Sequence, residues 1–292
     1  MGGVRAWVEA MRLRTLPVSV AGVVTACGLA VASGHFSAVP ALLCLAFAVL
    51  AQIASNFANE YYDYKAGLDR VGRAGPRRGV TEGDITPRAM LCATFATLAL
   101  AAVIGCGLIY YGGWWLLGAG VAIAVGALAY SAGPYPLSRH GWGEVAVVLF
   151  FGLVPVSLTY YVQALCCPMQ VIVAGAGVGL MGANVLIVNN YRDRDDDLTV
   201  GKLTLAVRLG RPAMLILYGF NVVAGAALMV PAWMLTARAL WSVVPALYVV
   251  ASLAILRQLS LRRGAAINPL LGMTAMAMLV HALLYLASAI AQ

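Results

Sequence analysis

Charged side chains are scarce in this sequence. Only 10% of its 292 residues are Asp, Glu, Lys or Arg, whereas 62% are hydrophobic. A soluble domain carries about 25% charged residues and about 45–50% apolar ones. The composition therefore excludes an ordinary soluble fold. The long apolar runs predict membrane-spanning helices, because a transmembrane barrel would show short alternating segments instead.

Two common kinds of ligand-binding motif are also missing. The six cysteines are scattered, without a CxxC pair or a Cys/His ligand spacing, so the sequence offers no zinc-type motif. It also lacks the glycine-rich Walker loop that cradles nucleotide phosphates. If the protein binds a phosphate group, we expect other residues to hold it.

What the sequence does contain is nine apolar segments, each near the roughly 20 residues that a bilayer crossing requires. We predict an all-α, polytopic membrane protein in which residues 1–292 form a single transmembrane domain. The predicted spans are residues 16–33, 39–62, 89–111, 114–131, 144–162, 171–191, 213–235, 240–259 and 269–291.

Charge is nearly absent from one side of this predicted bundle. The N-terminus lies on the same side as the loops after spans two, four, six and eight. That side carries all 11 acidic residues and 18 of the 19 basic ones. Only Arg238 lies on the opposite side. Lys and Arg mark the cytoplasmic face. We therefore predict a cytoplasmic (inner) membrane protein with cytoplasmic N-terminus and charged loops, and with the C-terminus outside. The same one-sided pattern argues against nucleic-acid binding, despite the net charge of +8.

The carboxylates gather at the ends of spans two and six. On span two, polar residues recur along one helical face at intervals of four, three and four: Gln52, Asn56, Asn59 and Asp63. On span six the interval is four: Asn189, Asp193 and Asp197. The two stripes occupy spans two and six, which are four spans apart. We therefore predict an internal repeat of four-helix units, spans one to four and five to eight, with span nine added. Such repeats place a site between the two halves.

Oxygen ligands of this kind suit Mg²⁺, which usually keeps several waters and bridges substrate phosphates. Basic residues surround both stripes, and acids mixed with Arg and Lys favour a metal bound together with an anion such as phosphate. Those residues are Lys65, Arg70, Arg73, Arg77, Arg78, Arg192, Arg194, Lys202 and Arg208. The alternative is that some of these charges are solvated loop residues and that Asn189 and Asn190 only pair helices.

The two motifs resemble those of the UbiA superfamily of intramembrane prenyltransferases. Residues 59–63, with Asp69 six positions later, resemble the first Asp-rich motif, and Asp193 and Asp197, spaced D-x-x-x-D, resemble the second. Glu60 departs from the pattern, since the family usually has Asp there. Within the superfamily the chain most resembles the 1,4-dihydroxy-2-naphthoate polyprenyltransferases of menaquinone biosynthesis. That closer resemblance rests on Arg73, Gly75, Pro76, Arg78 and Gly79, on Tyr130, Gly143 and Glu144, and on residues 160–163.

This resemblance implies Mg²⁺-dependent transfer of a polyprenyl group from polyprenyl diphosphate to 1,4-dihydroxy-2-naphthoate, with decarboxylation to a demethylmenaquinol. The implied metal ligands are Asn59, Asp63, Asp193 and Asp197, and the implied catalytic residues are Asp63, Asp193, Asp197, Lys65 and Lys202. The diphosphate would meet Lys65, Arg73, Arg78, Lys202, Asn56 and Asn190. The prenyl cation and acceptor would meet Tyr61, Tyr62 and Tyr130.

Two other functions stay open from the sequence. A related enzyme could prenylate another aromatic acceptor, such as 4-hydroxybenzoate, homogentisate or heme. A cation-coupled transporter would also carry carboxylates beside membrane helices, but transporter sites usually lie near the bilayer midplane. Here every carboxylate is expected at one face, which favours the enzyme.

Overall fold

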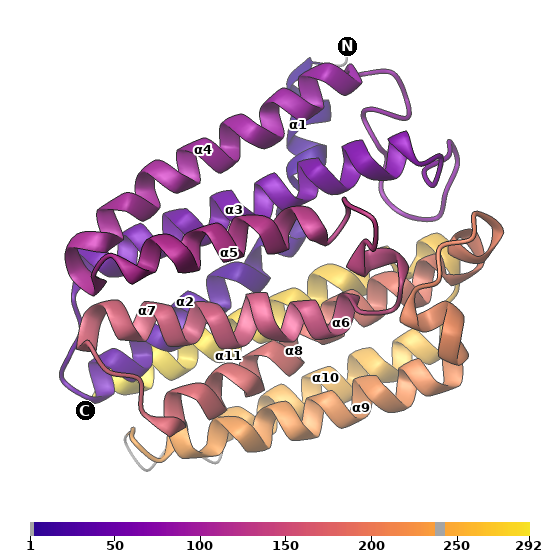
Figure 1. Ribbon diagram of the computed structural model, residues 1–292. Helices are drawn as coiled ribbons and strands as arrows, with labels where there is room; N and C mark the ends of the chain where they lie inside the picture. The colour runs from indigo at the N-terminus through magenta and orange to yellow at the C-terminus, as the bar shows by residue number, and fades with distance from the viewer. Residues whose placement is uncertain (1–2, 237–242) are drawn as a thin grey trace.

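The computed structural model describes residues 3–236 and 243–292, and in these ranges the chain forms helices and turns without any strand (Figure 1). The predicted all-α class is confirmed. Two expectations, the outward position of Arg238 and the start of the eighth span at Leu240, lie outside the described residues.

Each predicted span coincides with a helical segment. The chain begins with α1 (Gly3–Met11) and the short turn η1 (Leu13–Thr15). The spans follow as α2 (Leu16–Ala32), α3 (Ala38–Lys65), α4 (Pro87–Gly112), α5 (Trp115–Ala129), the continuous run α6 (Gly143–Val147), η3 (Val148–Leu153) and α7 (Val154–Ala164), then α8 (Met169–Thr199), α9 (Leu205–Trp233), α10 (Val243–Leu261) and α11 (Asn268–Ile290). Short turns η2 (Leu137–Arg139) and η4 (Gly264–Ile267) lie in two of the connections.

Eight of these segments in the described chain are long and apolar enough to cross a membrane. The fourth predicted span, α5, is a shorter apolar helix of 15 residues. At 1.5 Å per residue it is about 22 Å long, less than the roughly 30 Å hydrocarbon core. The predicted number of nine is therefore approximate.

The helices pair in a corresponding way in the two halves. The second predicted span packs along the third, as α3 against α4, and the sixth packs along the seventh, as α8 against α9. The first and last spans, α2 and α11, lie side by side, so the two ends of the chain are joined in one bundle (Figure 1). The pairing agrees with the expected four-helix repeat, which stays a prediction.

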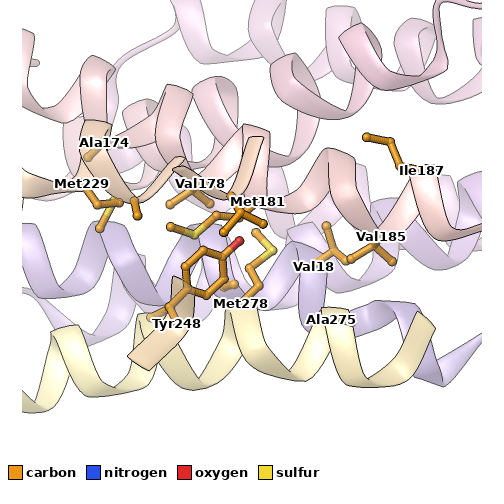
Figure 2. Packing of buried hydrophobic residues seen from close by; sticks show 14 of the residues in the cluster. Val18, Ala174, Val178, Met181, Val185, Ile187, Met229, Tyr248, Ala275 and Met278 are labelled. Atoms are coloured by element: carbon orange, nitrogen blue, oxygen red, sulfur yellow. The ribbon is translucent and has the colours of Figure 1, made fainter. Parts of the chain in front are cut away.

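The core is built around α8, most of whose apolar segment is buried by its neighbours. Figure 2 shows Met181 of α8 meeting Tyr248 of α10 and Met278 of α11. Lipid tails are as apolar as these side chains, so close packing rather than hydrophobic burial stabilises helix contacts in a bilayer. Flexible methionines fill the irregular space between the helices.

Glycines bring η3 and α8 into direct backbone contact. A Cβ placed on Gly152 would overlap the backbone of Gly179 and Gly175 on α8. Small residues at such crossings are typical of membrane helix packing. The sequence needs glycine here because this contact sets how close the η3 region, and the residues that begin α6, can come to α8.

We therefore expect Gly152→Ala to lower the thermal stability of the detergent-solubilised protein, since overpacking a tight contact typically costs about 1–3 kcal/mol. A matched control is Gly118→Ala on α5, where a Cβ would meet nothing within 4 Å. Melting followed by fluorescence-detected gel filtration would measure both. Equal melting temperatures for Gly152→Ala and the control would contradict this description of the contact.

The charged loops all lie at one end of the bundle, which gives the predicted orientation a direct test. Arg77, in the α3–α4 loop, has a half-exposed side chain. The exposed Cys166 and Cys167 lie between α7 and α8, at the opposite end of α8 from its carboxylates. With the other four cysteines replaced by Ser, an impermeant thiol reagent should label these two from outside intact cells.

In a background that lacks all six cysteines, Arg77→Cys should be labelled only after the cells are opened, because positive residues favour the cytoplasmic side. Labelling of position 77 in intact cells would invert the topology.

Candidate active site

The two polar stripes lie on helices that continue past their apolar segments. Helix α3 extends to Lys65 and α8 to Thr199, so Asp63, Asp193 and Asp197 all have helical backbone. Their exposed fractions are 0%, 1% and 6%, respectively. Asp195, on another face of α8, has a side chain that is 67% exposed. The predicted face of the second motif is confirmed.

Each stripe is neutralised by a cation from the other half of the chain. Lys202, in the turn after α8, places Nζ 3.1 Å from Oδ2 of Asp63 on α3. Arg73, in the loop after α3, places Nη2 2.7 Å from Oδ2 of Asp193 on α8. Arg192 also holds Asp193, with Nε 2.7 Å from Oδ1. This reciprocal exchange joins the two motif helices at the charged end of the bundle.

Asp69 connects the α3–α4 loop to this network. It accepts from Nη1 of Arg73 at 2.6 Å and lies 3.3 Å from Nε of Arg78. Burial raises the pKa of the Asp69 carboxyl, and Arg73 opposes that shift. Burial alone would lower the pKa of Arg73, but Asp193 and Asp69 outweigh it and raise that pKa. For Lys202, burial is likewise outweighed, by Asp63 and Asp197, and its pKa is raised. Both cations are therefore charged at neutral pH.

Asn59, in the first stripe, forms hydrogen bonds with four other residues. Its Nδ2 donates to Oδ2 of Asp63 at 3.1 Å and to Oγ of Ser131 at 2.9 Å. Its Oδ1 accepts from Arg12 at 2.6 Å and from Arg78 at 3.2 Å. One amide thus ties α3 to the N-terminal segment, to the connection after α5 and to the α3–α4 loop.

These groups surround a polar chamber with a cavity volume of about 140 Å³. Of the predicted site residues, Asn56, Asn59, Arg73, Arg78, Tyr130, Asn190, Asp193, Asp197 and Lys202 line it. An apolar chamber of about 260 Å³ adjoins it, between α3, α4, α5 and α7. Gln52, Ser55, Tyr130, Val147 and Phe151 line both, so one continuous hollow runs from charged to apolar surroundings.

Four predicted residues line neither chamber. Asp63 is completely buried beneath its ion pair with Lys202. Lys65 is exposed at the end of α3. Tyr61 and Tyr62 contact each other edge-to-face, with ring centroids 4.9 Å apart, and neither lines a chamber. The reason is helical geometry: each residue turns about 100°, so Lys65 lies about 200° around α3 from Asp63. Tyr61 instead packs in the cluster beneath α1.

Sequence reasoning missed two arginines. Arg12 lines the polar chamber, directed there by a left-handed backbone (φ 53°) between α1 and α2. Arg139 of η2 places Nη2 2.9 Å from the carbonyl oxygen of Tyr62 and 3.5 Å from Oδ1 of Asp63. No sequence pattern points to either, because a single basic residue in a short connection has no periodicity. Arg192, weighed as a loop charge, is in fact buried.

The C-terminal helix also braces this end. Asn268, the first residue of α11, donates from Nδ2 to the carbonyl oxygen of Ala74 at 3.2 Å, in the α3–α4 loop. Its Oδ1 accepts from Nη1 of Arg192 at 3.0 Å. Asp196 holds the same loop through Arg70 and through the backbone N–H of Ala74. The loop that carries Arg73 and Arg78 is therefore fixed from both α8 and α11.

The donor set fits Mg²⁺ in the way that this ion usually binds. Across the described residues, no three Asp, Glu, His or Cys side chains converge closely enough to hold a metal ion by themselves. Mg²⁺ is commonly held by one or two carboxylates, with waters and substrate phosphates completing the shell. Asp193, Asp197 and Asn59 line the polar chamber and supply oxygen atoms of this kind.

A profile described as the UbiA prenyltransferase family matches residues 21–275. The chain belongs to the UbiA prenyltransferase family. It is 39% identical to the 1,4-dihydroxy-2-naphthoate octaprenyltransferase of Mycobacterium tuberculosis, over 95% of this chain and 94% of that protein. It is 37% identical to the Escherichia coli protein of the same name, over 70% and 69% of the two chains. This UbiA family member is thus a prenyltransferase enzyme.

The fold agrees with that assignment. A UbiA homologue from Archaeoglobus fulgidus, solved with DMAPP and Mg²⁺, superimposes with a TM-score of 0.72, covering 98% of each chain at 16% identity. At that identity the likeness concerns the fold alone. The membrane bundle of this UbiA protein is therefore that of known membrane prenyltransferases.

The two faces of α8 give a sharp test of the site. Asp193→Asn and Asp197→Asn should each lower prenyl-transfer turnover at least 10²-fold, the range seen when a charge-stabilising contact is lost. Asp195→Asn is the matched control on the same helix and should change turnover less than about threefold, because Asp195 pairs with Arg194 and Arg211 away from the chamber. Asp63→Asn should resemble Asp193→Asn.

Because these residues act as a unit, the Asp63/Asp193 double mutant should be little worse than either single mutant. Gel filtration of each variant checks that it is folded. A loss in Asp195→Asn as large as that in Asp193→Asn would refute the assignment of the catalytic face.

Proposed function

We propose that this enzyme transfers a polyprenyl group from its diphosphate to 1,4-dihydroxy-2-naphthoate, releasing CO₂ and giving a demethylmenaquinol. The observation that carries the proposal is the continuous hollow, which is lined by cations and carboxylates at one end and by apolar side chains at the other. A polyprenyl diphosphate has the same division. The names of the relatives with 37–39% identity support the naphthoate acceptor.

The charged end would hold the diphosphate. Arg73, Arg78 and Lys202 line it and are fixed by ion pairs before any substrate arrives. Preorganised charges of this kind stabilise the charge that develops on a leaving group. Mg²⁺, held by Asn59, Asp63, Asp193 and Asp197, would add Lewis-acid neutralisation of the diphosphate.

The bond changes balance without a further reactant. The C–O bond of the prenyl diphosphate breaks and the diphosphate leaves with the electron pair. A ring carbon of the acceptor supplies the pair for the new C–C bond. The bond to the acceptor carboxylate then breaks, its pair returns to the ring, and CO₂ leaves. The apolar chamber would hold the prenyl chain and exclude water from the allylic cation, with Tyr130 at the boundary.

The predicted membrane orientation belongs to the same proposal. All the carboxylates that line the polar chamber are near the charged end of the bundle, and positive residues favour the cytoplasmic side. We therefore place the site at the cytoplasmic face of the inner membrane, with the C-terminus outside. This one-ended position also disfavours a cation-coupled transporter, whose site would lie near the midplane.

A direct assay tests the function. Membranes containing the protein, given radiolabelled farnesyl diphosphate and 1,4-dihydroxy-2-naphthoate, should form a labelled prenyl naphthoquinol and one CO₂ per turnover. EDTA should abolish the reaction and excess Mg²⁺ should restore it, because the ion would supply Lewis-acid neutralisation of the diphosphate.

Parallel reactions with 4-hydroxybenzoate, homogentisate and heme identify the acceptor, and membranes with the Asp193→Asn variant provide the blank. Label transferred only to one of those other acceptors would replace naphthoate, and full activity in metal-free buffer would remove Mg²⁺ from the proposal.

A further inference from the structure

Glu144, in the first turn of α6, is a buried carboxylate that the diphosphate site does not use. It is 6% exposed and accepts a hydrogen bond at Oε1 from Nδ2 of Asn190, 2.8 Å away. Its Oε2 is buried with no hydrogen-bond partner. Among the described residues Glu144 forms no ion pair. Of the carboxylates in the two motifs, all but Asp197 do form one. A buried acid in this state is costly and calls for an explanation.

The hydrogen bond fixes which way the Asn190 amide faces. The NH₂ group of Asn190 points at Glu144, because Nδ2 donates to Oε1. The planar amide then carries Oδ1 on its other arm, away from the carboxylate. Within the described part of the chain nothing donates to that Oδ1, while Asn190 itself lines the polar chamber. Glu144 thus makes Asn190 present an acceptor rather than a donor to a ligand.

The Oδ1 atom of Asn190 lies deeper in the bundle than the carboxylates of the second motif. Asn190 precedes Asp193 and Asp197 by three and seven residues, so on the same side of α8 it lies about 4.5 Å and about 10 Å farther from the charged end. Its partner Glu144 lies beside Tyr130. A Cβ added to Gly143, the residue before Glu144, would be 3.5 Å from the Tyr130 hydroxyl. Tyr130 and Val147 line both chambers. The pair is therefore beside the junction of charged and apolar surfaces, where the reacting carbons would meet.

We propose that Asn190, held by Glu144, accepts a hydrogen bond from a ring hydroxyl of the aromatic acceptor and so selects hydroxylated acceptors. Asn190, which the resemblance assigned to the diphosphate, contacts the aromatic acceptor in this proposal, and Glu144 is a positioning residue. The inference deepens the proposed function and rests on it. A site built to pair with a substrate hydroxyl rejects an analogue that lacks one, because its buried polar groups are then left unpaired.

The alternative is that this hydrogen bond only joins α6 to α8, since amides commonly pair membrane helices. The two descriptions differ in which kinetic constant changes. A bond that only joins helices would, when lost, disturb both substrates or neither. An acceptor-binding group affects the aromatic substrate alone.

The test uses full-length protein in membranes and four variants. Asn190→Ala and Glu144→Leu should raise the KM for 1,4-dihydroxy-2-naphthoate at least tenfold, and leave the KM for farnesyl diphosphate within twofold, which also shows that the site is folded. Glu144→Gln keeps an oxygen for Nδ2 of Asn190 and should recover most of the loss. Glu9→Gln, a partly exposed Glu on α1 outside both chambers, is the matched control.

A second measurement examines the hydroxyl itself. The inhibitors 1-hydroxy-2-naphthoate and 1-methoxy-2-naphthoate, and their 4-substituted isomers, should compete with the acceptor. The wild type should bind the hydroxyl form of one such pair at least tenfold better, and Asn190→Ala should bind the two forms equally. Equal preference in wild type and Asn190→Ala, or a parallel rise in both KM values, overturns the inference. Wild-type protein that transfers no prenyl group to any acceptor refutes the proposed function instead, so the two failures are distinguishable.

Discussion

Carboxylates buried at the ends of two membrane helices are the constraint on which the charged end of this protein depends. Removing water from Asp63 and Asp193 is expensive unless each has a close cation. The cations come from the opposite half of the chain. Lys202, in the turn after α8, pairs with Asp63 on α3, and Arg73, in the loop after α3, pairs with Asp193 on α8. Losing one partner of such a pair costs about 3–5 kcal/mol. The two halves are therefore joined through the charges that neutralise their buried carboxylates.

The same ion pairs serve both the stability of the fold and the proposed reaction. The cations that stabilise the buried carboxylates are those that line the chamber and would neutralise a diphosphate. The ion pairs hold these side chains in place before any ligand arrives. In the proposed reaction the carboxylates would hold the metal, and the arginine and lysine side chains would neutralise the diphosphate.

Features with a helical period could be predicted from the sequence. The spans, and the stripe of Asn189, Asp193 and Asp197, follow from the recurrence of residue types along one helix, and α8 indeed continues to Thr199. Contacts set by the path of a connection could not be predicted. Arg12 enters the chamber only because its backbone is left-handed. Tyr61 and Tyr62 were predicted as aromatic faces for the prenyl cation, whereas α3 turns them away from the face of Asp63.

The contacts of Asn268 imply that the charged end of the bundle is completed late in synthesis. This residue begins α11, yet it holds both Ala74 of the α3–α4 loop and Arg192 of α8. During synthesis the first eight predicted spans can enter the bilayer before Asn268 leaves the ribosome. Until then the loop that carries Arg73 and Arg78 lacks one of its two supports, and α2 has no α11 beside it. A nascent chain would therefore be inserted in the membrane well before its catalytic end was closed.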